Sequence, residues 1–104
     1  MIKQIDVTLL KELIDNLGVH VIDVREDHEL KICHENNFIH IKMNDIPVKI
    51  KDLDNTLNYA VICHSGVRSN IVCEYMQNRG FIVMNVSGGI DEWALRIKPS
   101  LKRY

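Results

Sequence analysis

The sequence lacks an excess of either charge, a long hydrophobic run and any stretch of low complexity. Its 104 residues carry 13 Lys and Arg against 14 Asp and Glu, a formal net charge of -1. This balance offers no basic field for nucleic acid and no polybasic patch for a membrane surface. No run approaches the roughly 20 apolar residues of a membrane-spanning helix, and residues 1–6 do not resemble a signal peptide. We therefore expect a soluble, cytoplasmic protein whose partners are small molecules or other proteins.

Cysteine is also scarce. The chain has 3 cysteines, an odd number, and none of them is in a CxxC arrangement. This pattern fits neither a disulfide framework nor the common zinc sites, and it favours a reducing compartment. His28, His34 and His40 lie near Cys33 in the sequence, but their spacing matches no common set of metal ligands. We expect no metal, and we interpret Cys33 and Cys73 as small buried residues.

Strand-like and helix-like patterns alternate along the chain. Short β-branched or alternating runs predict strands at 19–24, 38–43, 59–62 and 81–86. Helical apolar spacing or turn signals predict helices at 9–17, 45–53 and 68–79, and one more after Gly88-Gly89. Such alternation indicates an α/β fold in which helices cover both faces of a parallel sheet and ligands bind at the carboxyl ends of the strands. Since the sequence contains no repeat or linker, we expect a single domain over residues 1–104.

Several local features are predicted within this outline. Thr8 is the expected N-cap of the first helix, and Gly18 is its expected end. The polar stretch 26–35 carries no predicted element, and the polar tail 98–104 is expected to be loosely held. The inward stripe of the helix at 68–79 is expected to be formed by Ile71, Val72, Tyr75 and Met76.

Cys63 follows the apolar strand 59–62 and opens the loop CHSGVRS, residues 63–69. A cysteine between a buried strand and the start of a helix faces main-chain N–H groups and the positive end of the helix dipole. Both features, with Arg68 nearby, favour the thiolate and lower the pKa of the thiol. We predict that Cys63 is a nucleophile.

The CxxGxR pattern of this loop resembles the active-site loop of the rhodanese family of sulfurtransferases. Two flanking segments resemble the same family, namely VIDVRE at 21–26 and VSGGIDEW at 86–93. The three motifs occur in the family's order and span most of the chain. The resemblance implies a rhodanese-like fold with a central, mostly parallel sheet of about five strands and helices on both faces. It also implies that Cys63 is the catalytic cysteine.

Arg68 and Gly66 are expected to act directly on the sulfur site. We interpret Arg68 as a group that orients an anionic donor, the alternative being a helix-start arginine that faces solvent. Gly66 permits a positive φ, so that main-chain N–H groups can surround a bound anion, although it could also be an ordinary turn glycine. Four residues, His64 to Val67, separate Cys63 from Arg68. Related phosphatases of the cell-cycle type carry one residue more, so the resemblance implies sulfur chemistry.

The other loop residues are candidate substrate-binding groups. His64 stands where many family members carry arginine, and it either supplies a pH-dependent charge or is an uninvolved exposed side chain. Ser65 and Ser69 either donate hydrogen bonds to the bound sulfur species or satisfy backbone groups. Val67 completes the substrate-binding loop.

The flanking motifs have mainly structural interpretations. We expect the charges of Asp23, Arg25 and Glu26 to pair and to bond loop backbone. Gly88-Gly89 and Trp93 are interpreted as turn and packing residues.

The segment 32–38 departs from the family pattern. The pattern there has two glycines and a small residue, all of which are missing from this sequence, while His34 aligns and Phe38 is large. The pair Asn36-Asn37 could still adopt a left-handed turn. The fit of a partner that docks beside this segment is therefore open.

The resemblance implies a sulfurtransferase that takes a sulfane sulfur from thiosulfate or a persulfide donor. Cys63 would carry the sulfur as a persulfide and pass it to cyanide or a thiol, including a thiol of a thioredoxin-like or other sulfur-carrier protein. No cofactor is needed, and we expect a monomer. Two alternatives stay open: a non-catalytic module that binds a protein partner, and a relay that is loaded by a cysteine desulfurase. Cys73 is either buried filler or a resolving thiol for Cys63.

Overall fold

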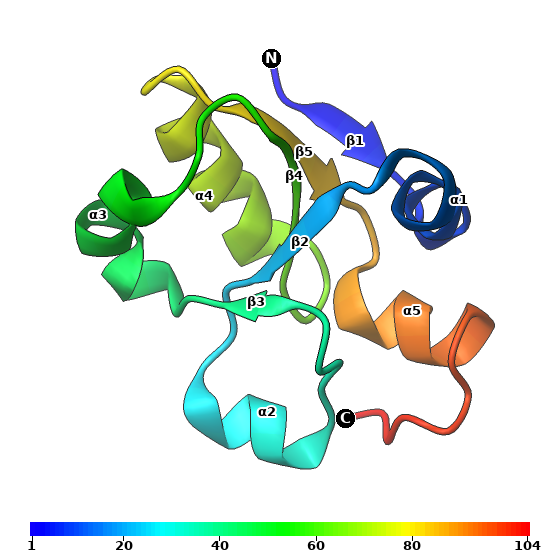
Figure 1. The fold of residues 1–104 in the computed structure, drawn as a ribbon. Coiled ribbons are helices and arrows are strands. Elements are labelled where there is room, and N and C mark those ends of the chain that lie inside the picture. Colours follow the sequence, from blue (N-terminus) through cyan, green and yellow to red (C-terminus); the bar gives the residue numbers. More distant parts are fainter.

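The computed structural model describes residues 1–104 and contains a five-stranded sheet in the order β1-β5-β4-β2-β3 (Figure 1). Every neighbouring pair of strands is parallel, so the predicted α/β fold with a mostly parallel sheet is confirmed. The strands are β1 (Lys3–Ile5), β2 (His20–Asp23), β3 (Ile39–His40), β4 (Asn58–Ile62) and β5 (Ile82–Val86). Because all strands run in the same direction, their carboxyl ends share one edge, where Cys63 directly follows β4.

Helices cover both faces of the sheet, as predicted. They are α1 (Val7–Leu17), α2 (Asp27–Ile32), α3 (Ile46–Lys49), α4 (Val67–Gln77) and α5 (Gly89–Arg96), with 3-10 turns η1 (Met43–Asp45) and η2 (Ile50–Asp52). Figure 1 shows α3 and α4 on one side of the sheet and α1 and α5 on the other. None of these helices combines the length and the apolar character that crossing a membrane requires.

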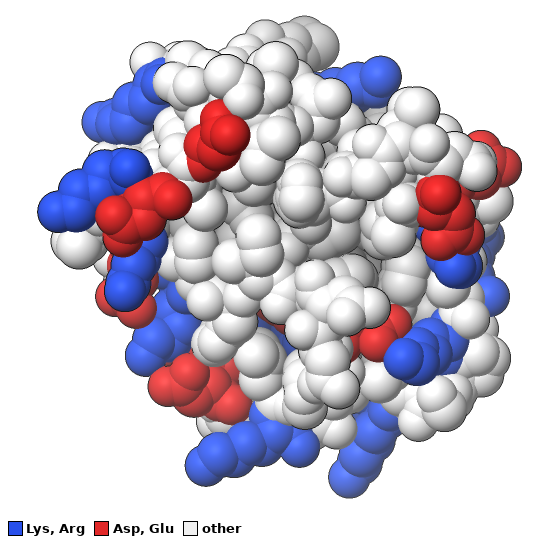
Figure 2. Space-filling model, in the orientation of Figure 1, with Lys and Arg blue, Asp and Glu red and all other residues white.

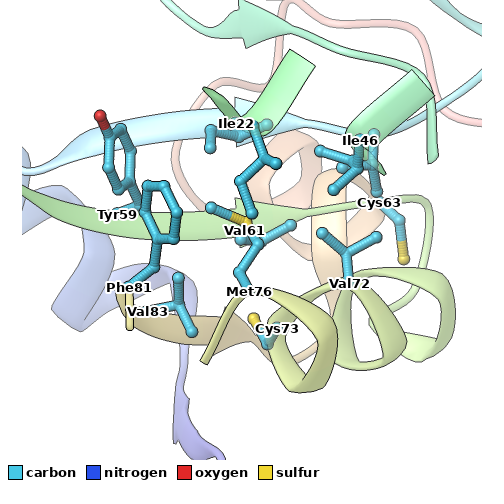
Figure 3. Packing of buried hydrophobic residues seen from close by; sticks show 12 residues of the cluster. Ile22, Ile46, Tyr59, Val61, Cys63, Val72, Cys73, Met76, Phe81 and Val83 are labelled. Carbon is cyan, nitrogen blue, oxygen red and sulfur yellow. The ribbon is translucent and has the colours of Figure 1, made fainter. Parts of the chain in front are cut away.

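Two hydrophobic clusters, one on each face, hold the helices against the sheet. Ala60 and Ile62 of β4 contact the cluster on the side of α1 and α5, whereas Val61 belongs to the cluster on the side of α3 and α4. This alternation follows from the two-residue period of a strand, and it makes the central strand apolar on both faces. Figure 3 shows Cys63 at the end of the second cluster, beside Val72. The candidate nucleophile is therefore anchored in the core.

The face of the molecule seen in Figure 2 carries no patch of a single sign. Figure 2 shows Lys and Arg side chains alternating with Asp and Glu side chains around the edge of one face, while the centre of that face is largely uncharged. This distribution agrees with the formal net charge of -1.

The first helix begins at a different cap from the one predicted. Asp6, not Thr8, is the N-cap: its side-chain Oδ1 accepts a hydrogen bond from the main-chain N–H of Leu9 at 2.8 Å. Asp6 can do so because its own backbone is extended while the next residue is already helical. The helix ends as predicted, with Gly18 in the left-handed conformation at φ 64°.

Two elements, β1 and α2, lie in stretches for which the sequence predicted no element. β1 is an edge strand that pairs with β5, and Ile5 is the one buried residue among its three. α2 has no apolar stripe but begins with a capping box, in which the Glu29 carboxylate accepts a hydrogen bond from the main-chain N–H of Glu26 at 3.0 Å.

Two further predictions are right in position and wrong in extent. The strand predicted at 38–43 is limited to Ile39–His40, and the helix predicted at 45–53 consists of the short α3 between two 3-10 turns. Pro47 lies in the first turn of α3, as expected.

The inward face of α4 is rotated relative to the prediction. Its buried residues are Ser69, Val72, Cys73 and Met76, while Ile71 is 51% exposed. Ser69 takes an inward position, where its hydroxyl finds polar partners in the Cys63 sulfur at 3.3 Å and Asn85 Oδ1. This rotation turns Ile71 toward solvent, so the predicted stripe is wrong at that residue.

The start of α5 holds the loop that follows β4. The main-chain N–H of Ile90 donates to the carbonyl of Cys63 at 2.8 Å, and that of Asp91 donates to the carbonyl of His64 at 3.2 Å. Gly89 lies so close that a Cβ there would overlap both carbonyl groups, and its φ is +58°. The predicted turn glycine therefore also permits a close approach of two backbone segments.

Gly89→Ala is expected to cost more stability than Gly80→Ala and to displace the active-site loop. Both glycines have a positive φ, but a Cβ at Gly80 would meet nothing within 4 Å. Gly80→Ala is therefore the control, and it should lose about 1 kcal/mol of unfolding free energy from backbone strain alone. Urea unfolding and the rate of Cys63 alkylation by iodoacetamide measure the two effects. Equal losses in both variants would contradict the close-approach argument.

Candidate active site

The Cys63 side chain points into a loop whose N–H groups surround it. Cys63 is 1% exposed, and its Sγ accepts a hydrogen bond from the main-chain N–H of Gly66 at 3.1 Å. The Ser69 hydroxyl lies 3.3 Å from the same sulfur. Gly66 makes this turn possible because its φ is +111°, a conformation that other residues rarely adopt. The geometry agrees with the predicted role of Gly66 in shaping an anion-binding loop.

The loop favours the thiolate of Cys63. Burial alone raises the pKa of the Cys63 thiol, because a charge is less stable away from water. The hydroxyl of Ser69 and the main-chain N–H groups of Ser69, Gly66 and Ser65 lower it, and together they outweigh burial. The pKa of Cys63 therefore lies below its ordinary value, as predicted, but these hydrogen bonds rather than Arg68 are the main cause. A thiolate is the nucleophilic form of cysteine.

The other two cysteines are buried in the core. Cys73 belongs to the cluster beneath α4, and burial raises its pKa to about 12. Its thiol therefore stays protonated and unreactive, which favours the interpretation of Cys73 as filler over that of a resolving thiol. Cys33 packs in the cluster on the opposite face.

Arg68 lies at the end of the loop, but its charge is paired with Glu29 of α2. The guanidinium donates to both carboxylate oxygens, at 2.6 and 2.8 Å. This bidentate pair holds the pKa of Glu29 well below its usual range. The alternative of an Arg68 side chain that simply faces solvent is therefore wrong. Sequence reasoning missed Glu29 because a single glutamate in a polar stretch is distinguished only by its capping-box spacing from Glu26.

His64 is held by the tail of the chain. Its imidazole stacks on the ring of Tyr104, with centroids 4.1 Å apart, and its Nε2 donates to the main-chain oxygen of Tyr104 at 2.7 Å. Ser65 and Val67, by contrast, are exposed at the outer rim of the loop. Gly66 and Ser69 thus contact the sulfur, whereas the side chains of Ser65 and Val67 lie at the rim and Ser65 contributes only its main-chain N–H to the sulfur.

Tyr104 also reaches the other side of the site. The prediction of a loosely held tail at 98–104 is therefore wrong. Its hydroxyl donates to Glu29 at 2.7 Å and accepts from Arg25 at 3.0 Å. Burial raises the pKa of Tyr104 to about 12, so the phenol keeps the proton that it donates. The tail is fixed further by an ion pair between Arg103 and Asp91 at 2.9 Å. No local pattern marks these contacts, because they join residues far apart in the sequence.

The charges of the first motif pair as predicted. Arg25 is fully buried and forms a 2.8 Å ion pair with Asp23, and it also donates to the carbonyl of Cys33 at 2.9 Å. Glu26 is the N-cap of α2. These residues contact the backbone behind the site and do not contact the Cys63 sulfur.

The segment that departs from the family pattern packs beneath α5. Phe38 meets Trp93 edge to face at 5.6 Å between ring centroids, and Trp93 Nε1 donates to Glu35 at 2.8 Å. Asn36 and Asn37 form a turn without a positive φ, so the suggested left-handed turn is wrong. The large Phe38 is accommodated because it fills space against Trp93, a packing residue as predicted.

This fold and loop define a class of α/β protein with an activated cysteine at the carboxyl edge of the sheet. The model of the rhodanese-like domain matches residues 6–96. The putative sulfurtransferase YtwF of Bacillus subtilis is 42% identical over 99 residues, which cover 94% of this chain and 96% of that protein. The thiosulfate sulfurtransferase GlpE of Vibrio cholerae is 24% identical over 90 residues, covering 86% and 85%.

The solved structures agree. The crystal structure of a rhodanese-like domain protein from Staphylococcus aureus has a TM-score of 0.85 and is 30% identical, covering 99% of both chains. The chain belongs to the rhodanese-like family, and the names of its relatives support sulfur transfer as its general activity.

Glu29→Gln is expected to weaken the dependence of stability on acid pH. Because its pKa is lowered in the folded protein, Glu29 stabilises the fold above the ordinary glutamate pKa of about 4.3, and this stability is lost as the pH falls toward the lower folded value. Urea unfolding at neutral pH and at about pH 3 measures this loss, which should be larger for the wild type than for the variant. Glu12→Gln, at an exposed position, is the control and should behave as the wild type. An equal loss in Glu29→Gln would contradict the pairing.

Proposed function

We propose that this chain transfers a sulfane sulfur from thiosulfate to cyanide or a thiol through a persulfide on Cys63. The observation that carries this proposal is the Cys63 sulfur itself, held 3.1 Å from the Gly66 N–H and 3.3 Å from the Ser69 hydroxyl in a loop that favours the thiolate. A relative named as a thiosulfate sulfurtransferase supports the choice of donor.

The reaction proceeds in two displacements. The Cys63 thiolate attacks the outer sulfur of thiosulfate, a new S–S bond forms, and the original S–S bond breaks with its electron pair leaving on sulfite. The acceptor then attacks the terminal sulfur of the persulfide, and the Cys63 thiolate is released. Cyanide becomes thiocyanate, and a thiolate becomes a persulfide. No external oxidant or reductant is required, because sulfur moves without net electron transfer.

The loop supplies hydrogen bonds where the negative charge develops. Main-chain N–H groups face the sulfur and replace water around the anionic intermediate. Ser65 and Val67 stand at the rim, where an incoming donor passes. Glu29 uses one N–H on each of two guanidinium nitrogens of Arg68 and leaves the other N–H donors free to orient an anionic donor. This neutralised pair suits a donor that must bind briefly and then release sulfite.

A protein thiol is the alternative acceptor or donor. A thioredoxin-like protein or another sulfur-carrier protein would exchange sulfur with Cys63 by the same displacement, and loading by a cysteine desulfurase would make the chain a relay. Each of these protein partners would meet the enzyme in the cytoplasm, where thiols are kept reduced.

Intact mass spectrometry of the reduced protein after incubation with thiosulfate tests the persulfide directly. We expect a gain of one sulfur atom that cyanide reverses, because cyanide accepts the terminal sulfur. Cys63→Ser should show no gain, whereas Cys73→Ser should behave as the wild type, since the Cys73 thiol is buried and protonated.

Absence of the adduct on the wild type would overturn thiosulfate as the donor. Incubation with a persulfidated cysteine desulfurase would then test the relay. Loading of Cys63 by that protein alone would favour the relay, and no loading by either donor would favour the non-catalytic binding module.

A further inference from the structure

Asn85 of β5 contacts two residues of the active-site loop, Ser69 and Gly66, that themselves contact the Cys63 sulfur. Asn85 is 3% exposed and Ser69 is fully buried. The Ser69 hydroxyl lies 2.5 Å from Asn85 Oδ1 and 3.3 Å from Cys63 Sγ. Both distances are compatible with a hydrogen bond, so two acceptors compete for one hydroxyl.

The orientation of the Asn85 amide is fixed by its other contacts. Its Nδ2 donates to the carbonyl of Gly66 at 3.1 Å and to Oε1 of Gln4 at 2.8 Å. A main-chain carbonyl can only accept a hydrogen bond, so the nitrogen must face Gly66 and the oxygen must face Ser69. Asn85 therefore presents an acceptor, not a donor, to the Ser69 hydroxyl.

A serine hydroxyl carries one hydrogen, which it can donate to one acceptor at a time. When Cys63 is a thiol, its S–H can donate to Ser69 Oγ while the Ser69 hydrogen stays on Asn85. When Cys63 is a thiolate, the sulfur becomes a strong acceptor, and the Ser69 hydroxyl turns toward it. Asn85 Oδ1 then loses its donor in a buried place, which costs free energy.

We propose that Asn85 is a positioning residue that competes with Cys63 for the hydrogen of Ser69 and so sets how readily the thiolate forms. Asn85 acts on the sulfur through Ser69 and does not touch the reacting atoms. It keeps the thiolate from being stabilised by every available donor at once, and a less stabilised thiolate is a stronger nucleophile.

The Ser69 hydrogen also changes its acceptor during sulfur transfer, a statement that rests on the proposed function. In the persulfide the negative charge lies on the terminal sulfur, and Cys63 Sγ is bonded to two atoms and uncharged. The Ser69 hydrogen then returns to Asn85. When the acceptor breaks the S–S bond, the electron pair goes to Sγ, and the hydroxyl turns back to the new thiolate. Only the hydroxyl rotates, and no proton is transferred.

The pH profile of Cys63 alkylation by iodoacetamide tests the proposal without any sulfur donor. Asn85→Leu removes the competing acceptor, so the midpoint of the profile should shift to lower pH, and the rate well below the midpoint should rise about threefold. Asn85→Asp keeps the size of the side chain and offers a stronger acceptor, so its midpoint should shift to higher pH.

The effect must depend on Ser69. In the Ser69→Ala background, Asn85→Leu should no longer shift the midpoint, because there is no hydrogen to compete for. Ser87→Ala is the matched control: Ser87 donates to Gln4 at 3.2 Å at the exposed end of the same network and does not contact Ser69. It should leave the profile unchanged.

A shift of equal size with and without Ser69 would overturn the proposal, and so would an unchanged midpoint in both folded Asn85 variants. If Asn85→Leu does not fold, the isosteric Asn85→Asp decides, since its shift should be smaller in the Ser69→Ala background. Failure of the thiosulfate reaction would leave this measurement unaffected, so the two proposals can fail separately.

Discussion

The N–H groups at the start of α5 hold the carbonyls of Cys63 and His64, and the chemistry of the site depends on these hydrogen bonds. A trans peptide unit carries its N–H opposite its carbonyl, so fixing the His64 carbonyl on the α5 side of the loop turns the Ser65 N–H toward the sulfur. The loop must also turn from β4 into α4 within a few residues, which requires the positive φ of Gly66. The nucleophile is therefore activated by the Ser69 hydroxyl together with main-chain N–H groups, and a helix at the far end of the chain holds the loop that carries them.

A second layer of the site is a chain of buried and half-buried charges. It runs from Asp23 through Arg25 and the Tyr104 hydroxyl to Glu29 and Arg68. Taking such groups from water offsets much of their attraction, although the lowered pKa of Glu29 means that its charged form still favours the folded state. The effect of the network is to fix positions. It places Arg68 at the end of the active-site loop and joins β2, α2 and the tail around the same edge of the sheet.

The sequence was most informative where local pattern and tertiary environment agree. The strands ending at Asp23, Ile62 and Val86 contain short apolar runs because they are buried on both faces, and such runs are recognisable without a structure. β1 and α2 were missed because one has a single buried residue and the other has no apolar stripe. Ile71 was misplaced because counting apolar positions cannot reveal that a serine takes an inward position.

The site was predictable only in part for the same reason. The loop motif indicated Cys63, Gly66 and Ser69, whose roles depend on neighbours in the sequence. Tyr104 and Asn85 act on the loop from 40 and 16 to 19 residues away. Neither has a local signature, because a tyrosine in a polar tail and an asparagine in a strand are both ordinary. Only the packing of the chain shows what they contact.

The tail ending at Tyr104 has a practical consequence for how the protein is handled. Figure 1 shows the N-terminus at the opposite end of the molecule from the C-terminus, which lies beside α2 and below the active-site loop. Any polypeptide joined after Tyr104 begins next to His64 of the active-site loop. An affinity tag or fluorescent fusion there would crowd the active-site loop and disturb the contact between Tyr104 and His64, whereas the same tag before Met1 would begin far from that loop.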